Sequence, residues 1–215
     1  MLKNNKNICD LMKKFIIFDF DGTIADTFSV VEEIANEYVK KYSIKLDPKE
    51  ARVLGLKKVL IKSKFPIWKI PAILPSVKKR IGLRLKNDVN LFKGMKNVLK
   101  QLSKKYHLGI VSTNSKESIM IFLTKYKISS LFKFVHSDSS LFGKHIVLKR
   151  SFKKYHLTYN DVVYVGDEDR DIQAAKKSHI KIIAVSWGYN SKSLLLKNSP
   201  DYIADNPKQL LKILS

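Results

Sequence analysis

One string of thirteen residues, 15–27 (FIIFDFDGTIADT), constrains the fold of this chain more than any other stretch. Its first four residues are apolar and β-branched or aromatic, which is typical of a strand buried on both faces of a parallel sheet. Asp19 and Asp21 follow where that strand would end, and residues two apart in a strand point to the same side. Buried carboxylates need a partner or a cation, so the string predicts a divalent-cation site, with Gly22 and Thr23 beside it. The alternative is that both acids only cap the next helix.

From residue 91 onward, short apolar segments alternate with helix-like segments. We predict strands at 108–111, 132–135, 161–165, 182–185 and 202–204, separated by helices. Strict alternation of this kind predicts an α/β fold with a doubly wound parallel sheet. Ligands of such sheets bind beyond the carboxyl ends of the strands.

Residues 28–88 interrupt this alternation. A stripe of apolar residues at helical spacing predicts a helix over 29–42, and further helices are expected at 51–61, with a break near Gly55, and at 76–85. A proline-punctuated aromatic stretch, 65–71, separates the last two, and we expect no strand between 28 and 90. The sequence therefore predicts two units: an α/β core of residues 1–27 and 89–215, and a helical insertion of residues 28–88.

Three further motifs follow predicted strands or precede a predicted helix. Ser112, Thr113 and Asn114 end the second strand, where hydroxyl and backbone N–H groups can hold phosphate oxygens, although these residues are also ordinary in turns. Lys144 follows a glycine just before a helix. The alternative is that Lys144 is an ordinary surface lysine. Lys149 is the second candidate for the lysine of this site.

The segment 166–171 (GDEDRD) is the third of these motifs. Four acids within five residues at the end of an apolar strand would repel one another without a cation. The segment therefore predicts a cation near these acids, with Arg170 paired to Glu168 or Asp169. The alternative is a solvated acidic turn.

In this order, the four stretches resemble the four motifs of the haloacid dehalogenase (HAD) superfamily, most of whose members are phosphatases. Three later stretches are similar to the phosphoglycolate-phosphatase-like branch: the pair Ala174-Ala175, residues 182–188 and the string Pro200-Asp201-Tyr202. The resemblance implies that Asp19 is a nucleophile that forms an aspartyl-phosphate and that Asp21 is the general acid and base. It also implies that Ser112 and Lys144 hold the phosphoryl group, with a helical cap formed by residues 28–88.

The resemblance also implies the cofactor and the remaining binding residues. Mg²⁺ would be held by Asp19, the backbone carbonyl of Asp21 and Asp167, with Asp171 nearby. Thr23, Thr113 and Asn114 would contribute to substrate binding. A phosphomutase of the same superfamily is the alternative activity.

The expected substrate is a small phosphate ester. Residues 45–90 hold thirteen basic and three acidic side chains, and in proteins resembling this one a loop near Gly55 approaches the leaving group. Arg52, Lys57 and Lys58 flank that glycine. We hypothesise that one of them meets a second negative charge on a doubly anionic ester such as phosphoglycolate; the alternative is that all three face solvent.

A formal charge of +22 raises nucleic-acid binding as a rival function. Of the 41 basic residues only five are arginine, the residue best suited to bidentate phosphate or guanine contacts, so we expect no nucleic-acid partner. Cys9 is the single cysteine, which favours a reducing, cytoplasmic location. No apolar run reaches the roughly 18–20 residues of a membrane span, and we expect a monomer or weak dimer.

Overall fold

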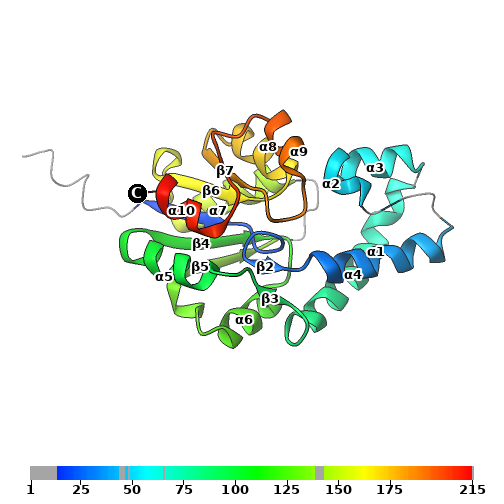
Figure 1. Ribbon diagram of the computed structural model, residues 1–215, viewed down its shortest axis with the longest axis horizontal. Coiled ribbons are helices and arrows are strands. Elements are labelled where there is room, and N and C mark those ends of the chain that lie inside the picture. The colour runs from blue at the N-terminus through cyan, green and yellow to red at the C-terminus, as the bar shows by residue number, and fades with distance from the viewer. Residues whose placement is uncertain (1–13, 44–46, 48, 65, 139–142, 215) are drawn as a thin grey trace, which may run out of the picture.

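A six-stranded sheet forms the centre of the protein. The computed structural model describes residues 14–214 except 44–46, 48, 65 and 139–142. All paired neighbours in the sheet are parallel, in the order β5-β4-β1-β6-β7-β8 (Figure 1). The strands are β1 (Phe15–Phe18), β4 (His107–Ser112), β5 (Phe132–Ser137), β6 (Val162–Gly166), β7 (Lys181–Val185) and β8 (Tyr202–Ala204). The predicted parallel α/β fold is confirmed.

Helices cover both faces of the sheet, and β1 shows why its sequence is apolar throughout. Ile16 and Phe18 of β1 belong to one buried cluster, whereas Ile17 belongs to a second cluster on the opposite face. The first cluster is completed by α5 (Met95–Lys105), α6 (Lys116–Lys125) and α10 (Pro207–Ile213). The second is completed by α7 (Lys144–Tyr155), α8 (Asp169–Lys177) and α9 (Lys192–Lys197), the last of which was not predicted. Short 3₁₀ helices lie at Ile67–Lys69, Ser129–Leu131 and Tyr159–Asp161.

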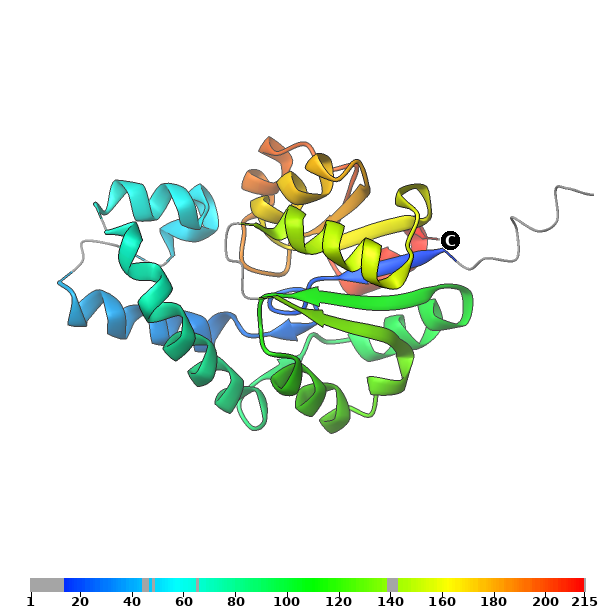
Figure 2. The ribbon, with the colours of Figure 1, turned by 180° about the vertical axis from the view of Figure 1, so that it is seen from behind.

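The helical insertion after the first strand is also present. It comprises α1 (Phe28–Lys41), α2 (Glu50–Leu54), α3 (Leu56–Lys62) and α4 (Ile70–Leu85), and it lies beyond the carboxyl end of the sheet (Figure 2). Gly55, with φ of +82°, separates α2 from α3, as the sequence predicted. The insertion leaves and re-enters the core through β2 (Ala25–Asp26) and β3 (Asn90–Leu91), which pair antiparallel. These two-residue strands were too short to predict.

The predicted break at residues 65–71 is wrong at its end, because α4 already begins at Ile70. Pro71 lies in the first turn, where its missing N–H has no helical partner to lose. Pro75 lies inside the helix and removes one backbone hydrogen bond there. Packing against α1 and α6 holds the helix together despite this loss. Among the described helices, none is long and apolar enough to cross a membrane.

Candidate active site

The sheet topology brings the predicted site residues together. β1 lies between β4 and β6, and the chain builds the sheet outward from β1 first on one side and then on the other. The carboxyl ends of neighbouring strands on either side of such a switch point form the usual ligand site of these sheets. Asp19 follows β1, Ser112 ends β4 and Asp167 follows β6. Residues that are up to 148 positions apart in the sequence thus meet at one edge.

Lys144, the first residue of α7, is the central cation of the site. Its Nζ donates to Oδ2 of Asp19 at 2.6 Å and is ion-paired with Oδ1 of Asp171. The lysine side chain is only 4% exposed. Burial opposes its charge, but Asp171 and Asp19 raise its pKa above the ordinary lysine value. Lys149, the second candidate, is exposed on the same helix, so the structure places Lys144 and not Lys149 at the site.

Three carboxylates form a buried group. Asp19, Asp167 and Asp171 each offer an oxygen, and these atoms lie within 4.8 Å of one another. Burial raises the pKa of Asp19 to about 6, against the lowering effect of Lys144, and raises the pKa of Asp167 well above its ordinary value. Three acids against one lysine leave an excess of negative charge. Hard oxygen donors with that excess fit a divalent cation such as Mg²⁺.

Backbone and hydroxyl donors fix two of these acids. Asp167 accepts from the Thr23 hydroxyl and from the Tyr189 N–H, each at 2.7 Å. Asp171 accepts from the N–H groups of Asp167 and Glu168 at 3.1 and 3.0 Å and so completes a capping box at the start of α8. The carboxylate of Asp167 is therefore oriented by the loops after β1 and β7, and that of Asp171 by the loop between β6 and α8.

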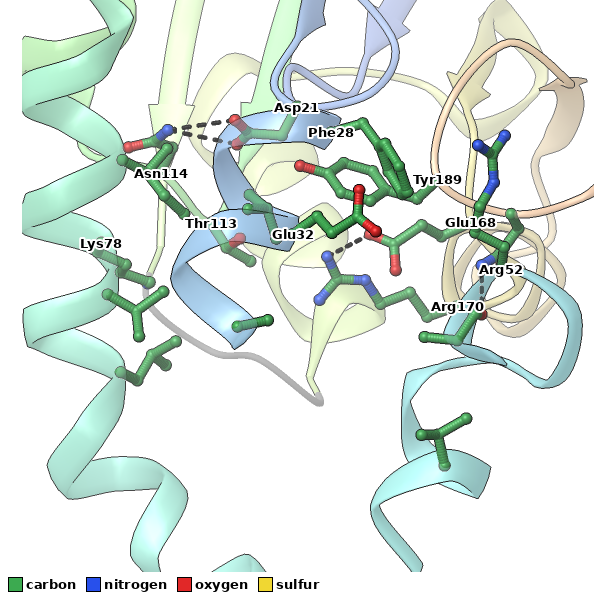
Figure 3. A pocket seen from close by; sticks show the side chains of 18 residues that line it. Asp21, Phe28, Glu32, Arg52, Lys78, Thr113, Asn114, Glu168, Arg170 and Tyr189 are labelled. Atoms are coloured by element: carbon green, nitrogen blue, oxygen red, sulfur yellow. Dashed lines mark hydrogen bonds and ion pairs between the residues drawn. The ribbon is translucent and has the colours of Figure 1, made fainter. Parts of the chain in front are cut away.

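Asp21 lies apart from the three-carboxylate group. Its carboxylate accepts from Nδ2 of Asn114 at 3.3 and 3.4 Å, one contact to each oxygen, and it borders a cavity of about 270 Å³ (Figure 3). Burial, followed by the nearby charge of Asp19, raises the pKa of Asp21 to about 6. Its side chain thus faces the cavity, and a role for its backbone carbonyl in metal binding stays a prediction.

The loop after β4 lies on the other side of β1 from the loop after β6. Oγ of Ser112 accepts from the N–H of Asn114 at 3.0 Å, which fixes the turn, and Thr113 and Asn114 line the cavity. Thr23, predicted to bind substrate, is instead fully buried, and its hydroxyl is used to hold Asp167. In this geometry Thr23 positions Asp167, and its predicted contact with substrate stays a prediction.

The three basic residues near Gly55 do not lie together. Arg52 borders the cavity of Figure 3, but its Nη2 donates to the carbonyl of Gly188 at 3.2 Å and its guanidinium lies 4.6 Å from the Phe28 ring centroid. Lys57 and Lys58 are exposed and border a second cavity of about 430 Å³, which also reaches Lys144. Their predicted contact with substrate stays a prediction.

Several residues of the site were not predicted as ligand contacts. Arg170 borders both cavities and donates to Glu168 at 2.5 Å, which confirms only its expected pairing with an acid. Tyr189 and Asn190 follow β7 and border the first cavity. The rule that ligands bind at the carboxyl ends of strands would have indicated them. Lys78 and Glu32 carry no such signal, because only the folding of the insertion brings them there.

Comparison with known proteins identifies the class. The sequence model of the haloacid dehalogenase-like hydrolase family matches residues 16–185. A phosphoglycolate phosphatase from Synechococcus elongatus is 31% identical over 205 residues, which cover 93% of this chain and 96% of the relative. Pyrophosphatase PpaX from Oceanobacillus iheyensis is 24% identical and covers 93% of this chain and 95% of the relative.

Solved structures agree in fold. A predicted phosphatase from Clostridium acetobutylicum superimposes with a TM-score of 0.81 at 18% identity, covering 94% of this chain and 98% of the other. A HAD-like hydrolase from Streptococcus pneumoniae gives 0.75 at 23% identity, with the same coverage. The family match and these shared folds together define a hydrolase with a doubly wound parallel sheet. The chain belongs to the haloacid dehalogenase-like hydrolase family.

A pair of glycine substitutions tests how tightly the loop after β1 packs on Asp167. Gly22 has φ of +75°, and a Cβ there would lie 2.2 Å from Oδ2 of Asp167. Gly94 has φ of +86° but no atom within 4 Å of such a Cβ. Both alanine variants pay about 1 kcal/mol of backbone strain, and only Gly22→Ala adds a clash. We expect Gly22→Ala to lower the free energy of unfolding, measured in urea, by at least about 1 kcal/mol more than Gly94→Ala. Equal losses would show that this contact is loose.

Proposed function

We propose that the protein is a Mg²⁺-dependent phosphatase that hydrolyses a small phosphate monoester through an aspartyl-phosphate on Asp19. The observation that carries the proposal is the contact of Asp19 with Lys144 within a group of three buried carboxylates. A carboxylate nucleophile, a fixed cation beside it and a set of oxygen donors for a metal are the parts that phosphoryl transfer requires. The similarity to a phosphoglycolate phosphatase makes phosphoglycolate the first ester to assay.

The first half of the reaction transfers the phosphoryl group to the protein. An oxygen of Asp19 attacks phosphorus, a new P–O bond forms, and the bond from phosphorus to the leaving oxygen breaks. Asp21 donates its proton to that leaving oxygen, which departs as an alcohol. A pKa of about 6 suits this role, because a useful fraction of the group carries a proton near neutral pH.

The second half releases phosphate. Asp21, now a carboxylate, takes a proton from a water molecule as that water attacks phosphorus, and the bond to Asp19 breaks to give inorganic phosphate. Asp21 borders the cavity, so it can reach both the leaving alcohol and the incoming water. Each group returns to its starting protonation state at the end of the cycle.

Charge neutralisation supports both halves. Lys144 would stabilise the negative charge that develops on the phosphoryl oxygens, and the turn formed by Ser112, Thr113 and Asn114 would supply hydrogen-bond donors. Mg²⁺, held by Asp19 and Asp167 with Asp171 close by, would reduce the repulsion between the nucleophile and the phosphate. The second cavity, which Lys57 and Lys58 border, gives an anionic ester a positively charged approach.

Residues 28–88 act as a cap in this proposal. The turn at Gly55 packs on the core, since a Cβ there would lie 2.8 Å from Oδ2 of Asp169. Two hydrogen bonds to backbone carbonyls join the same parts: the Ser191 N–H donates to the Arg52 carbonyl at 2.7 Å, and the side-chain Nδ2 of Asn190 donates to the Ala51 carbonyl at 3.3 Å. The packing of α4 on α6 and the paired strands β2 and β3 complete the join between the two parts. In this proposal the cap opens for exchange and closes to exclude water.

The arginines do not favour nucleic-acid binding. Arg80, Arg84, Arg150 and Arg170 are all ion-paired with acidic side chains, and Arg52 bonds a backbone carbonyl. Guanidinium groups engaged in this way are not presented for bidentate contact with phosphate or bases. This observation supports the hydrolase proposal over the rival function.

Replacing the nucleophile tests the proposal directly. Asp19→Asn should lower Mg²⁺-dependent phosphate release from phosphoglycolate by more than about 10⁴-fold, because it removes the attacking group. Asp26→Asn is the matched control, since Asp26 is an exposed acid seven residues away. Activity in the first variant close to that of the control would disprove the role of Asp19.

The role of Asp21 predicts a defined pH dependence. Because Asp21 must be protonated to act as an acid, kcat should fall as the pH rises through about 6, where burial and Asp19 place its pKa. Asp21→Asn keeps an acceptor for Asn114 but cannot carry the proton, so kcat should fall about 10²–10⁴-fold and lose this alkaline limb. A loss below about tenfold would assign the proton transfer to another acid, with Glu168 the first candidate.

The choice between two lysines of α7 is also testable. Lys144→Met keeps an unbranched side chain that is one atom shorter but removes the charge that faces Asp19 and Asp171, and kcat/KM should fall about 10²–10³-fold. Lys149→Met is the matched control, because Lys149 is exposed on the same helix. Similar losses in both variants would contradict the assignment of Lys144.

A further inference from the structure

The cavity of Figure 3 lies between the helical insertion and the core, and its two sides differ in chemistry. The core side carries Asp21, Thr113 and Asn114 (Figure 3). The insertion side is mostly apolar, with residues at helical spacing on two facing helices. They are Phe28, Val31 and Ala35 on α1, and Leu74, Val77 and Ile81 on α4.

Most charged groups at this cavity are already engaged within the protein. Arg170 donates to Glu168, and Arg52 lies against Phe28 and bonds the Gly188 carbonyl. Glu32 lies 3.9 Å from Lys49. A charged leaving group would have to give up its hydration against apolar walls, which is unfavourable unless a partner compensates. An apolar group would be stabilised there by leaving water.

The volume adds a second constraint. A cavity of about 150 Å³ lined by apolar side chains is large enough to hold benzene. The cavity here is about 270 Å³, enough for one aromatic ring together with part of a phosphoryl group. The two-carbon leaving group of phosphoglycolate would leave much of that space and of the apolar wall in contact with water.

Asp21 ties the cavity to the reaction. It is the proposed general acid, and its carboxylate borders the same cavity as the apolar stripe. The atom that receives the proton from Asp21 belongs to the leaving group, so the leaving group has to extend from Asp21 into this space. We infer that the cavity selects a phosphate monoester whose leaving group is an apolar alcohol about the size of one aromatic ring. This inference rests on the proposed phosphatase function.

Three esters test the inference on the wild-type protein with Mg²⁺. Ethyl phosphate and benzyl phosphate both release a primary alcohol, so they differ mainly in apolar volume, and phosphoglycolate adds a second charge. Benzyl phosphate should exceed ethyl phosphate in kcat/KM by more than about tenfold, and it should also exceed phosphoglycolate. Phosphate release from none of the three would contradict the proposed function itself. Release without this preference would leave the phosphatase in place and overturn the inference.

A pair of matched substitutions tests whether the cavity causes the preference. Ala35→Phe on α1 places a ring in the cavity and should reduce the benzyl-to-ethyl ratio at least tenfold. Ala72→Phe makes the same change at an exposed position of α4 and should leave the ratio as in the wild type. Circular dichroism checks folding, and Ala35→Leu is the smaller substitute if Ala35→Phe does not fold. A benzyl preference that survives filling at Ala35 would place the leaving group elsewhere and overturn the inference.

Lys78 provides the opposing test. It borders the cavity from α4, half-buried, with Asp138 and Asp21 as its acidic neighbours and Arg170 as a nearby cation. If phosphoglycolate is the preferred ester and Lys78→Met removes that preference, the cavity binds a second anion and the inference is wrong. If Lys78→Met leaves the benzyl-to-ethyl ratio unchanged, the apolar wall is the source of the selectivity.

Discussion

The ion bridge from Lys144 to Asp19 and Asp171 is the interaction on which the site depends. It joins the end of β1, the start of α7 and the start of α8, and all three side chains are buried. Breaking one partner of a buried ion pair leaves an uncompensated charge, which is much more unfavourable than losing a surface pair. The bridge therefore fixes how the first turns of α7 and α8 pack at the end of β1, and it also orients the proposed nucleophile.

Close backbone packing is what allows this density of acids. A Cβ at Gly188 would lie within 2.4 Å of both Asp167 and the Gly22 carbonyl, so the loops after β1 and β7 meet around that carboxylate. Backbone N–H groups and the Thr23 hydroxyl then satisfy the carboxylate oxygens. Hydrogen bonds to the charged form partly offset the desolvation of these acids, and the remaining negative charge is what a divalent cation would neutralise.

In the proposed mechanism, chemistry and selectivity come from different parts of the chain. The core strands end in the proposed reacting groups, whereas the four helices of the insertion, α1 to α4, build most of the cavity wall. β2 and β3 join the two parts where the chain passes between them. Because the core site does not depend on the wall, one set of reacting groups can serve different leaving groups when the insertion changes.

The sequence alone determined the parallel sheet, the helical insertion and the strand ends that carry Asp19, Ser112 and Asp167. These follow from local patterns, since an apolar run followed by acids is unfavourable in any fold that does not place the acids at a strand end. It did not determine that Thr23 would turn inward to Asp167, or that Arg52 would be separated from Lys57 and Lys58. The first outcome depends on how the loop after β1 packs against the loop after β6, and the second on how the insertion docks on the core. Only the tertiary structure decided them, because each joins segments that are far apart in the sequence, and side chains at helical spacing can face either solvent or a cavity until the neighbouring element is in place.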